Sequence, residues 1–389
     1  MFSTADWDEP YWTNKQHTAA VLARLGWRVL YVESPGIRSP RMASKRDWKR
    51  LWRRLWRGVQ SVVLGAPQRD HNIWVLSPLV FPAKHHWPFI GSFNKLLLRG
   101  TIDRMAKRLG FDHPVVWTYH PFMLNAVSHV ERGPTVYHCV DDLRAIPGVD
   151  IEAFNLAEEE LLRSSQAVFT TAHALKERCK RLNPNTHFFA NVVDADHFEA
   201  AMREGGLPDD LERIPTPRLV YHGVLSDFKI DLPLLLEVAR RRKDWSWVFI
   251  GEEREGQQSP LVAELKRLPN VHFLGYRSYQ SLPEYLRGMQ VGLLPTLLNE
   301  YTRSMFPMKF FEYLAAGLPV VSTPLAFTEQ LFDGLELGGD VASFEVAIER
   351  QLARGRLTQE EARLYVGENT WDARTAKMLE YVQSLRPVL

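Results

Sequence analysis

Two charged residues three positions apart, Lys309 and Glu312, carry the most informative chemistry in the sequence. Residues 308–316 are rich in good helix formers, Gly317 can end a helix, and Pro319 prevents it from continuing. On a helix, residues three apart share a face. Near the positive end of the helix dipole a lysine can hold phosphates, and a glutamate one turn further along can accept hydrogen bonds from a ribose diol. A solvated ion pair is the alternative interpretation.

The wider sequence around this pair favours ligand binding. From Pro307 to Val321 it reads P-x-K-x-x-E-Y-x-A-x-G-x-P-V-V. This string resembles the nucleotide-binding motif of GT-B glycosyltransferases, in which a glutamate-bearing helix precedes Gly-x-Pro-Val-Val. The resemblance covers nearly the whole chain and is strongest over residues 218–324. It points to bacterial enzymes of cell-surface polysaccharide synthesis, near family 4 and the xanthan glucuronosyltransferases.

Apolar strands and helices alternate along the chain, which predicts an α/β fold with doubly wound parallel sheets. A length of 389 residues exceeds one ordinary core and predicts two domains. The GT-B resemblance implies that these domains are Rossmann-like and face a cleft. We expect an N-terminal acceptor-binding, membrane-facing domain, a polar linker, a nucleotide-sugar donor domain and a C-terminal helix that crosses back, at residues 1–205, 206–217, 218–370 and 371–389.

The expected elements can be placed by residue number. Asn191-Val-Val-Asp194, with Phe198, resembles the signature that closes the first domain of many GT-B enzymes. The expected strands are 28–33, 72–76, 115–119, 135–139, 167–171, 218–223, 247–251, 271–275, 291–295 and one that begins at 320; the expected helices are 14–25, 152–164, 175–182, 232–241, 308–316 and 371–385.

The resemblance extends the donor site beyond the first charged pair. A strand ends at Gly223, where a phosphate could approach the backbone, and an ordinary tight turn is the alternative there. The residues after the strand 271–275 are implied to hold the base through backbone groups. The further donor-binding residues implied in this way are Met308, Gly223, Tyr276, Arg277, Lys229, Arg303 and Ser304.

Two positions depart from the family pattern. Many retaining members carry a glutamate eight residues before the second one, where this chain has Ser304. Many also place an arginine directly after the phosphate-loop glycine, where this chain has Val224. Neutralisation of phosphate charge is therefore expected to fall to Lys309, assisted by Lys229 or Arg303, and the stereochemistry of transfer stays open.

The segment 137–142, Tyr-His-Cys-Val-Asp-Asp, ends in two carboxylates at the end of a strand, where open α/β sheets place their sites. In an inverting transfer a carboxylate deprotonates the acceptor hydroxyl. The resemblance aligns Asp141 with this base, and Asp142 is expected to cap the following helix. His120 resembles a family histidine near the transferred sugar, and a purely structural histidine is the competing interpretation.

The segment 38–57 is strongly basic, with Asp47 as its only acid. At about 100° per residue, tryptophans and leucines fall on one helix face and basic residues on the other, which is typical of an interfacial helix. A core-facing helix and nucleic-acid binding are the alternatives, but the Trp and Arg content suits anionic lipid better. The predicted membrane-binding residues are Trp48, Arg50, Trp52, Arg53, Arg54, Trp56 and Arg57.

Composition limits the class of protein. The net charge of +2 conceals an asymmetry, because residues 1–110 hold 19 Lys and Arg against 7 Asp and Glu. The sequence has no apolar run of membrane-spanning length and no signal peptide, so we expect a cytoplasmic protein, peripheral on the inner face of the cell membrane. Cys139 and Cys179 are expected to be reduced and buried. The GT-B resemblance implies no required metal or other cofactor.

These features predict a glycosyltransferase that moves a sugar from a nucleotide-diphosphate donor, a UDP-sugar by default, to a lipid-linked glycan acceptor in cell-surface polysaccharide synthesis. An anionic membrane surface is an expected partner and nucleic acid is not. Two alternatives stay open: a transferase or epimerase of the same fold with a soluble substrate, and a non-catalytic nucleotide-sugar-binding partner, which Ser304 and Val224 would allow. The sequence identifies neither the sugar, the acceptor, the linkage nor the oligomeric state.

Overall fold

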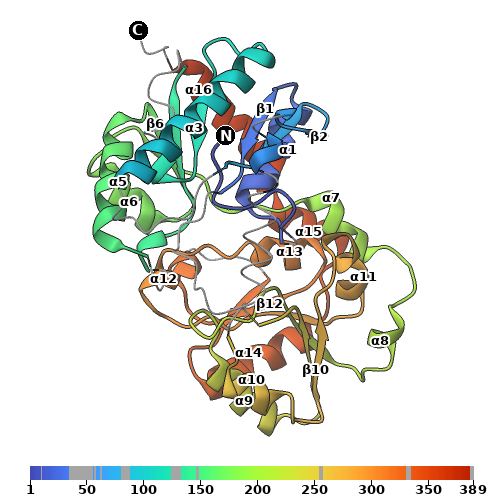
Figure 1. The fold of residues 1–389 in the computed structure, drawn as a ribbon. Helices are drawn as coiled ribbons and strands as arrows, with labels where there is room; N and C mark the ends of the chain where they lie inside the picture. The colour runs from blue at the N-terminus through green and yellow to red at the C-terminus, as the bar shows by residue number, and fades with distance from the viewer. Residues whose placement is uncertain are drawn as a thin grey trace. The chain divides into compact units, whose positions relative to one another are not determined.

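The chain folds into two compact units, residues 1–189 with 375–389 and residues 190–374 (Figure 1). The computed structural model describes residues 1–9, 11–34, 56, 58–61, 64–79, 88–123, 133–145, 149–253, 257–329 and 334–385. Among the helices described, none combines the length and the hydrophobicity needed to span a bilayer.

The first unit is built on parallel strands that meet at the start of the chain. Phe2 forms isolated bridges to both β1 and β4, and the backbone N–H of Tyr119 donates to Phe2 O over 2.9 Å. Short β2 pairs antiparallel with β3, and the other pairings in the unit are parallel. The strands are ordered β1-β3-β2 and β4-β5-β6-β7, with bounds β1 Val29–Val32, β2 Gln68–Asp70, β3 Ile73–Leu76, β4 Val116–Thr118, β5 Thr135–Cys139, β6 Ala167–Thr170 and β7 Thr186–Phe188.

Helices cover both faces of this sheet. Alternate strand residues point to opposite faces, so Val136 joins the core under α1 and α16 while Tyr137 joins the core under α5 and α6. Met378 of α16 is fully buried in the first of these cores. The sheet is therefore doubly wound, with helix bounds α1 Asn14–Arg24, α3 Pro88–Arg108, α5 Ile151–Ser164, α6 His173–Lys180 and α16 Trp371–Ser384.

The second unit holds one six-stranded sheet whose pairings are all parallel. Its order is β10-β9-β8-β11-β12-β13, so the direction of chain progress reverses between β8 and β11. Ligands of open α/β sheets bind at the carboxyl ends of the strands beside such a switch point. The strand bounds are β8 Arg218–His222, β9 Ser246–Ile250, β10 Val271–Gly275, β11 Val291–Leu294, β12 Val320–Ser322 and β13 Leu335–Leu337.

Two cores sandwich this second sheet. One contains residues of α9, α10 and α14, and the other contains residues of α7, α11, α13 and α15. Figure 1 shows α9, α10 and α14 together at the lower end of the ribbon. The helix bounds are α7 Ala195–Glu199, α9 Leu232–Arg241, α10 Pro260–Leu265, α11 Leu282–Arg287, α13 Lys309–Ala315, α14 Val341–Arg354 and α15 Gln359–Val366.

The two compact units divide at 189/190 and 374/375. The domain boundaries predicted from the sequence are 205 and 370. The expected linker 206–217 contains the short helix α8 (Asp209–Glu212), and Leu211 is fully buried in the core of the second unit. The Arg287 guanidinium also donates to Gly206 O over 2.9 Å. The polar composition of this segment concealed the apolar residues that anchor it.

Candidate functional site

Three glycines mark the carboxyl ends of neighbouring strands in the second unit. Gly223, Gly251 and Gly275 follow or end β8, β9 and β10, and their φ angles are +113°, +144° and +72°. The Gly251 N–H donates to Gly275 O over 2.8 Å. A Cβ on Gly251 would lie 2.1 Å from Gly223 O, so only glycine fits there. The result is a stretch of bare backbone beside the switch point, which a phosphate or a base can approach closely.

Gly223 was predicted from the sequence as a site residue, whereas Gly251 was not. The signal was the repetition itself, since each of the three apolar strands 218–222, 246–250 and 271–275 ends at or just before a glycine. A single glycine after a strand is ambiguous. Three glycines at the ends of adjacent strands indicate that a ligand must approach the backbone closely at all three positions.

The ammonium group of Lys309 lies against this backbone. A Cβ on Gly223 would come within 2.8 Å of both Lys309 Cε and Nζ, and Nζ lies 5.4 Å from the centroid of the Tyr221 ring. Burial lowers the pKa of Lys309, and the nearby Glu312 opposes that shift. An ammonium that has lost part of its water is well placed to bind an anion that replaces the lost hydration.

Glu312 lies one helical turn from Lys309 and is 7% exposed. Its Oε2 lies 3.2 Å from Nε2 of His222, the last residue of β8. The structure therefore brings together Gly223, Lys309 and Glu312, as the sequence motif predicted, and adds His222, which the sequence analysis did not single out. Met308 precedes α13 as its N-terminal flanking residue.

Tyr276 and Arg277 follow β10 at the same edge. Tyr276 is 36% exposed. The Arg277 guanidinium is engaged by the Asp210 carboxylate and by the Tyr285 hydroxyl, 2.6 Å from Nε. The Arg277 side chain thus holds the loop in place through these contacts. This is compatible with the expectation that Tyr276 and Arg277 bind a ligand through their backbone groups.

The loops that follow β8 and β11 are tied together. Lys229 Nζ donates to the Tyr301 hydroxyl over 3.0 Å and lies 4.5 Å from the centroid of the same ring. Asn299 Nδ2 donates to Phe228 O over 2.7 Å. These bonds bring Lys229 to the short helix α12 (Glu300–Arg303), at whose end Arg303 is exposed and Ser304 is half-buried.

In the first unit, His120 and Asp141 follow the neighbouring strands β4 and β5. His120 is 1% exposed, and neither ring nitrogen has a hydrogen-bond partner among the described residues. Burial lowers the pKa of His120 to about 4, so the ring is neutral at neutral pH. Asp141 is partly exposed at the carboxyl edge of the sheet.

Asp142 has the contacts expected of a cap. Its Oδ1 accepts hydrogen bonds from the backbone N–H of Arg144 over 3.3 Å and from Arg144 Nε over 2.8 Å. Burial alone would raise the pKa of Asp142, but the hydrogen bonds from Arg144 and the charges of Arg178 and Arg144 outweigh burial and hold this pKa below its ordinary value. The two neighbouring carboxylates thus differ in their contacts, since Asp142 binds Arg144 in a short turn of 3₁₀ helix (Leu143–Ala145).

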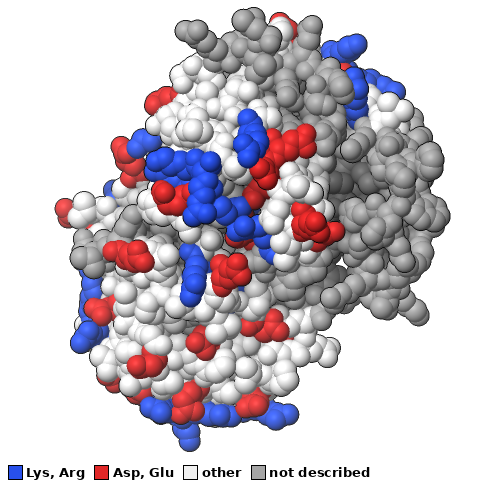
Figure 2. Space-filling view, turned by 90° about the vertical axis from the view of Figure 1, so that its left-hand side faces the viewer, with Lys and Arg blue, Asp and Glu red and all other residues white. Residues whose placement is uncertain are grey.

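The predicted membrane-binding residues lie outside the described residues except for Trp56, which is 66% exposed. Figure 2 views the side of the molecule on which α5 and α6 lie and shows acidic and basic side chains interspersed there. Ion pairs such as Arg163 with Glu159 account for part of this pattern. The described residues of this side therefore present a mixed surface, not a purely basic one.

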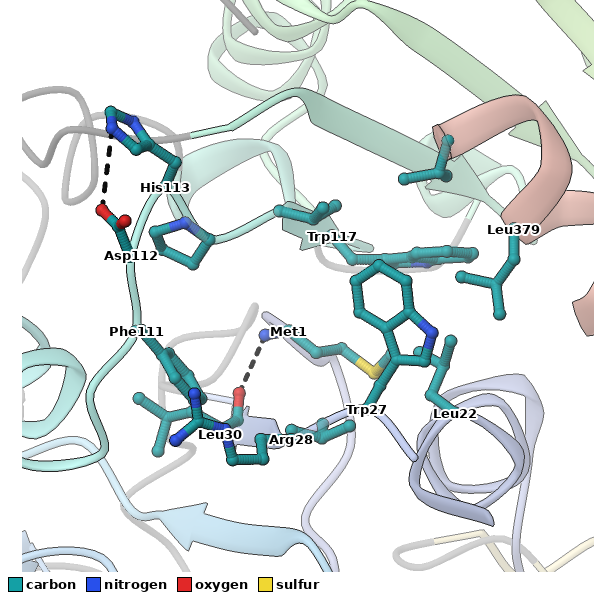
Figure 3. Close-up of a pocket in the computed structure, with 14 residues that line it drawn as sticks. Met1, Leu22, Trp27, Arg28, Leu30, Phe111, Asp112, His113, Trp117 and Leu379 are labelled. Carbon is teal, nitrogen blue, oxygen red and sulfur yellow. Dashed lines mark hydrogen bonds and ion pairs between the residues drawn. The ribbon is translucent and has the colours of Figure 1, made fainter. Parts of the chain in front are cut away.

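A cavity of about 360 Å³ in the first unit is separate from these residues (Figure 3). Its walls are mainly apolar and include Trp27, Phe111, Trp117 and Leu379. It lies at the amino ends of β1 and β4, whereas His120 follows the carboxyl end of β4. Of the predicted site residues that the structure describes, none lines this cavity.

Comparison with known proteins identifies relatives of this arrangement. Residues 216–354 match the family described as glycosyl transferases group 1. A putative teichuronic acid biosynthesis glycosyltransferase, TuaH of Bacillus subtilis (strain 168), is 30% identical over 161 residues, which are 39% of this chain and 40% of that protein. The chain thus aligns with less than half of the length of this curated relative.

Solved structures share the fold at low sequence identity. Anabaena Alr3699/HepE in complex with UDP and glucose has a TM-score of 0.65 and 15% identity, and the match covers 99% of this chain and 98% of that one. WaaG, a glycosyltransferase involved in lipopolysaccharide biosynthesis, has a TM-score of 0.61 and 12% identity, with 98% and 99% covered. The predicted α/β fold of GT-B type is confirmed, and residues 216–354 carry the match to the group 1 glycosyl transferases.

Proposed function

We propose that this protein transfers a sugar from a UDP-sugar to a lipid-linked glycan in cell-surface polysaccharide synthesis. The GT-B fold and the match of residues 216–354 to the group 1 glycosyl transferases support this proposal. The single observation that carries this proposal is the cluster of Gly223, Lys309 and Glu312 at the switch point of the second sheet. Bare backbone, a desolvated cation and a buried carboxylate are the three features that a nucleoside diphosphate requires.

We propose one orientation for the nucleotide-sugar donor on this cluster. The diphosphate lies over Gly223 and accepts hydrogen bonds from Lys309, while the ribose hydroxyls donate to Glu312. The base contacts backbone groups of Tyr276 and Arg277 at the end of β10. Lys229 and Arg303 add positive charge at the phosphate side, with Met308 and Ser304 beside them.

UDP is the proposed nucleotide because Anabaena Alr3699/HepE, which shares the fold, has been solved in complex with UDP and glucose and with UDP-glucose. Polysaccharide synthesis is the proposed setting because TuaH is described as a teichuronic acid biosynthesis enzyme. Since the lysine can neutralise the leaving diphosphate, we propose that transfer needs no metal. Binding and transfer that survive EDTA would support this point.

Asp141 is the proposed base. Its carboxylate takes the proton of the acceptor hydroxyl as the acceptor oxygen bonds to the anomeric carbon, the bond from that carbon to UDP breaks, and UDP leaves as the anion. His120 is neutral, and its ring nitrogens have no hydrogen-bond partner in the part of the chain that the structure describes, so it is proposed to hydrogen-bond the sugar or the acceptor. The arrangement requires the acceptor to reach the carboxyl edge of the first sheet.

The proposed membrane association depends on the segment 38–57. Replacing Arg50, Arg53, Arg54 and Arg57 by Gln should abolish salt-sensitive binding to anionic vesicles in a sedimentation assay, because each basic residue near the surface contributes about 1 kcal/mol. Donor hydrolysis should persist in this variant. Vesicle binding that survives the four changes would contradict the interfacial-helix hypothesis.

The experiment that tests the donor site is calorimetry with UDP, GDP, dTDP and CMP, each with Mg²⁺ and with EDTA. We expect UDP to bind in both conditions. Glu312→Ala should weaken it by about 1–3 kcal/mol, the cost of losing hydrogen bonds to a charged group. The matched control is Glu284→Ala, which removes an exposed glutamate of the same unit. Binding by none of the nucleotides would overturn the proposed function.

A further inference from the structure

His222 is a polar residue that the proposed donor site does not yet use. It ends β8, the central strand beside the switch point, and is 6% exposed. Its Nε2 lies 3.2 Å from Glu312 Oε2, although the two atoms are not aligned as a full hydrogen bond and Nε2 has no other partner among the described residues. The buried imidazole of His222, which can donate a hydrogen bond, thus lies next to the Glu312 carboxylate.

The ring is fixed from several sides. The backbone N–H of His222 donates to the Tyr313 hydroxyl over 3.2 Å, and that hydroxyl donates to Val220 O over 3.2 Å. The Tyr313 ring meets the His222 ring edge-on at 5.1 Å, and the Phe198 ring lies parallel at 6.5 Å. Because Tyr313 is the residue after Glu312, these contacts join β8 to α13 where the carboxylate projects.

The charged and titratable groups that face His222 define its protonation state. Burial lowers its pKa, Glu312 opposes that effect, and the ammonium of Lys309 adds to it. The Tyr313 hydroxyl contacts its backbone. The ring is therefore neutral at neutral pH and can carry its one N–H on Nε2, where it faces the carboxylate.

We propose that His222 is a positioning residue, whose Nε2–H donates to Oε2 of Glu312 and turns the remaining lone pairs of the carboxylate toward the ribose diol. This inference rests on the proposed function, because it assumes that Glu312 binds the ribose. A carboxylate has about four acceptor positions, so one can be occupied by the histidine while both sugar hydroxyls are bound. His222 then makes the site selective for ribonucleotides.

The test compares UDP with 2′,3′-dideoxy-UDP in calorimetry, on wild type, His222→Phe and His222→Gln. Phenylalanine keeps an aromatic ring but removes the donor, and glutamine retains an N–H. We expect His222→Phe to bind UDP about tenfold more weakly, as for the loss of one hydrogen bond to a charged group, and to bind the dideoxy compound with unchanged affinity. His222→Gln should recover part of the preference for UDP.

The outcomes separate this inference from the proposed function. Equal loss for both nucleotides in His222→Phe, or no loss for either, would overturn the positioning role. If His222→Phe fails to fold, His222→Leu takes its place: a loss confined to UDP supports the role, and equal losses for both compounds or no loss for either contradict it. If wild type binds both nucleotides equally well, Glu312 does not hold the ribose and the proposed donor geometry itself fails.

Discussion

Replacing Lys309 by Met should weaken donor binding without lowering the stability of the ligand-free protein. The ammonium lies against Gly223, within 2.8 Å of the position of a Cβ there, and thus directly at the bare backbone that we assign to the diphosphate. Charge-assisted hydrogen bonds contribute about 1.5–3 kcal/mol each. Lys309→Met should therefore weaken UDP binding by about 10- to 150-fold in calorimetry. Uridine, which lacks phosphate, should bind the variant and wild type alike.

The same substitution should not destabilise the ligand-free protein and can stabilise it. Because burial lowers the pKa of Lys309 below that of the unfolded chain, the folded protein carries a cost for its charged form. This cost is present at neutral pH and disappears as the pH rises above the unfolded value of 10.5. Lys309→Met, a side chain of similar length, should thus be at least as stable as wild type at pH 7 by thermal denaturation.

The pH dependence of UDP affinity gives an independent test of the same lysine. Diphosphate favours the charged amine, so wild-type affinity should fall as the pH rises through the lowered pKa of Lys309, and Lys309→Met should lose this dependence. Lys243→Met, which changes an exposed lysine in the same unit, is the matched control. Unchanged UDP affinity in Lys309→Met, or equal losses for UDP and uridine, would refute the phosphate assignment.

Three further variants probe other parts of the chain. Gly223→Ala, at φ +113° and against the lysine ammonium, should strain the loop by about 1–3 kcal/mol and weaken UDP binding, whereas Gly206→Ala, with no atom within 4 Å of the added Cβ, should change neither stability nor affinity. Asp141→Asn should lower the rate of transfer by about 10²–10⁴-fold with the Kd of UDP unchanged; a normal rate would remove it as the base. Glu158→Leu leaves the partly buried Arg178 guanidinium without its carboxylate and should lower the urea midpoint, with a loss of stability smaller than the about 3–5 kcal/mol that breaking a fully buried pair costs; an unchanged midpoint would contradict this reasoning.

Much of the second sheet could be predicted because its central strands are buried on both faces. Such strands appear in the sequence as continuous apolar runs with glycine at the end, and β8, β9, β10 and β11 lie within one residue of the predicted bounds. Helix α13 spans Lys309–Ala315, against the predicted 308–316. The stop signals Gly317 and Pro319 fixed its end.

The strands that were not predicted are short or peripheral. In β2, all three residues are exposed, so no apolar pattern reveals it. β7 and β13 are also three residues long, and each lies at the edge of its sheet, where it pairs with one neighbouring strand. Phe2 joins two strands as a single bridged residue, which depends wholly on tertiary contacts. Local propensity carries little information in such cases.

The donor site was predicted as far as one continuous motif could reach. Lys309 and Glu312 share a helix, and their spacing is visible in the sequence. His222 is distant in the chain, since its backbone contact Tyr313 is 91 positions away, and only the packing of α13 on β8 brings it to the carboxylate. A histidine before a glycine has no distinctive local pattern, so the residue could be found only in the folded structure.

The two candidate groups of the first unit can be ranked by the charge that proton transfer would create. Accepting a proton turns a carboxylate at Asp141 into a neutral group, whereas the same step at His120 places a positive charge in a site where burial already lowers the pKa to about 4. Asp141 is also the more accessible of the two, since it is partly exposed and His120 is 1% exposed. If transfer inverts the anomeric centre, the acceptor proton should therefore go to Asp141, and His120 should act only as a neutral hydrogen-bonding group.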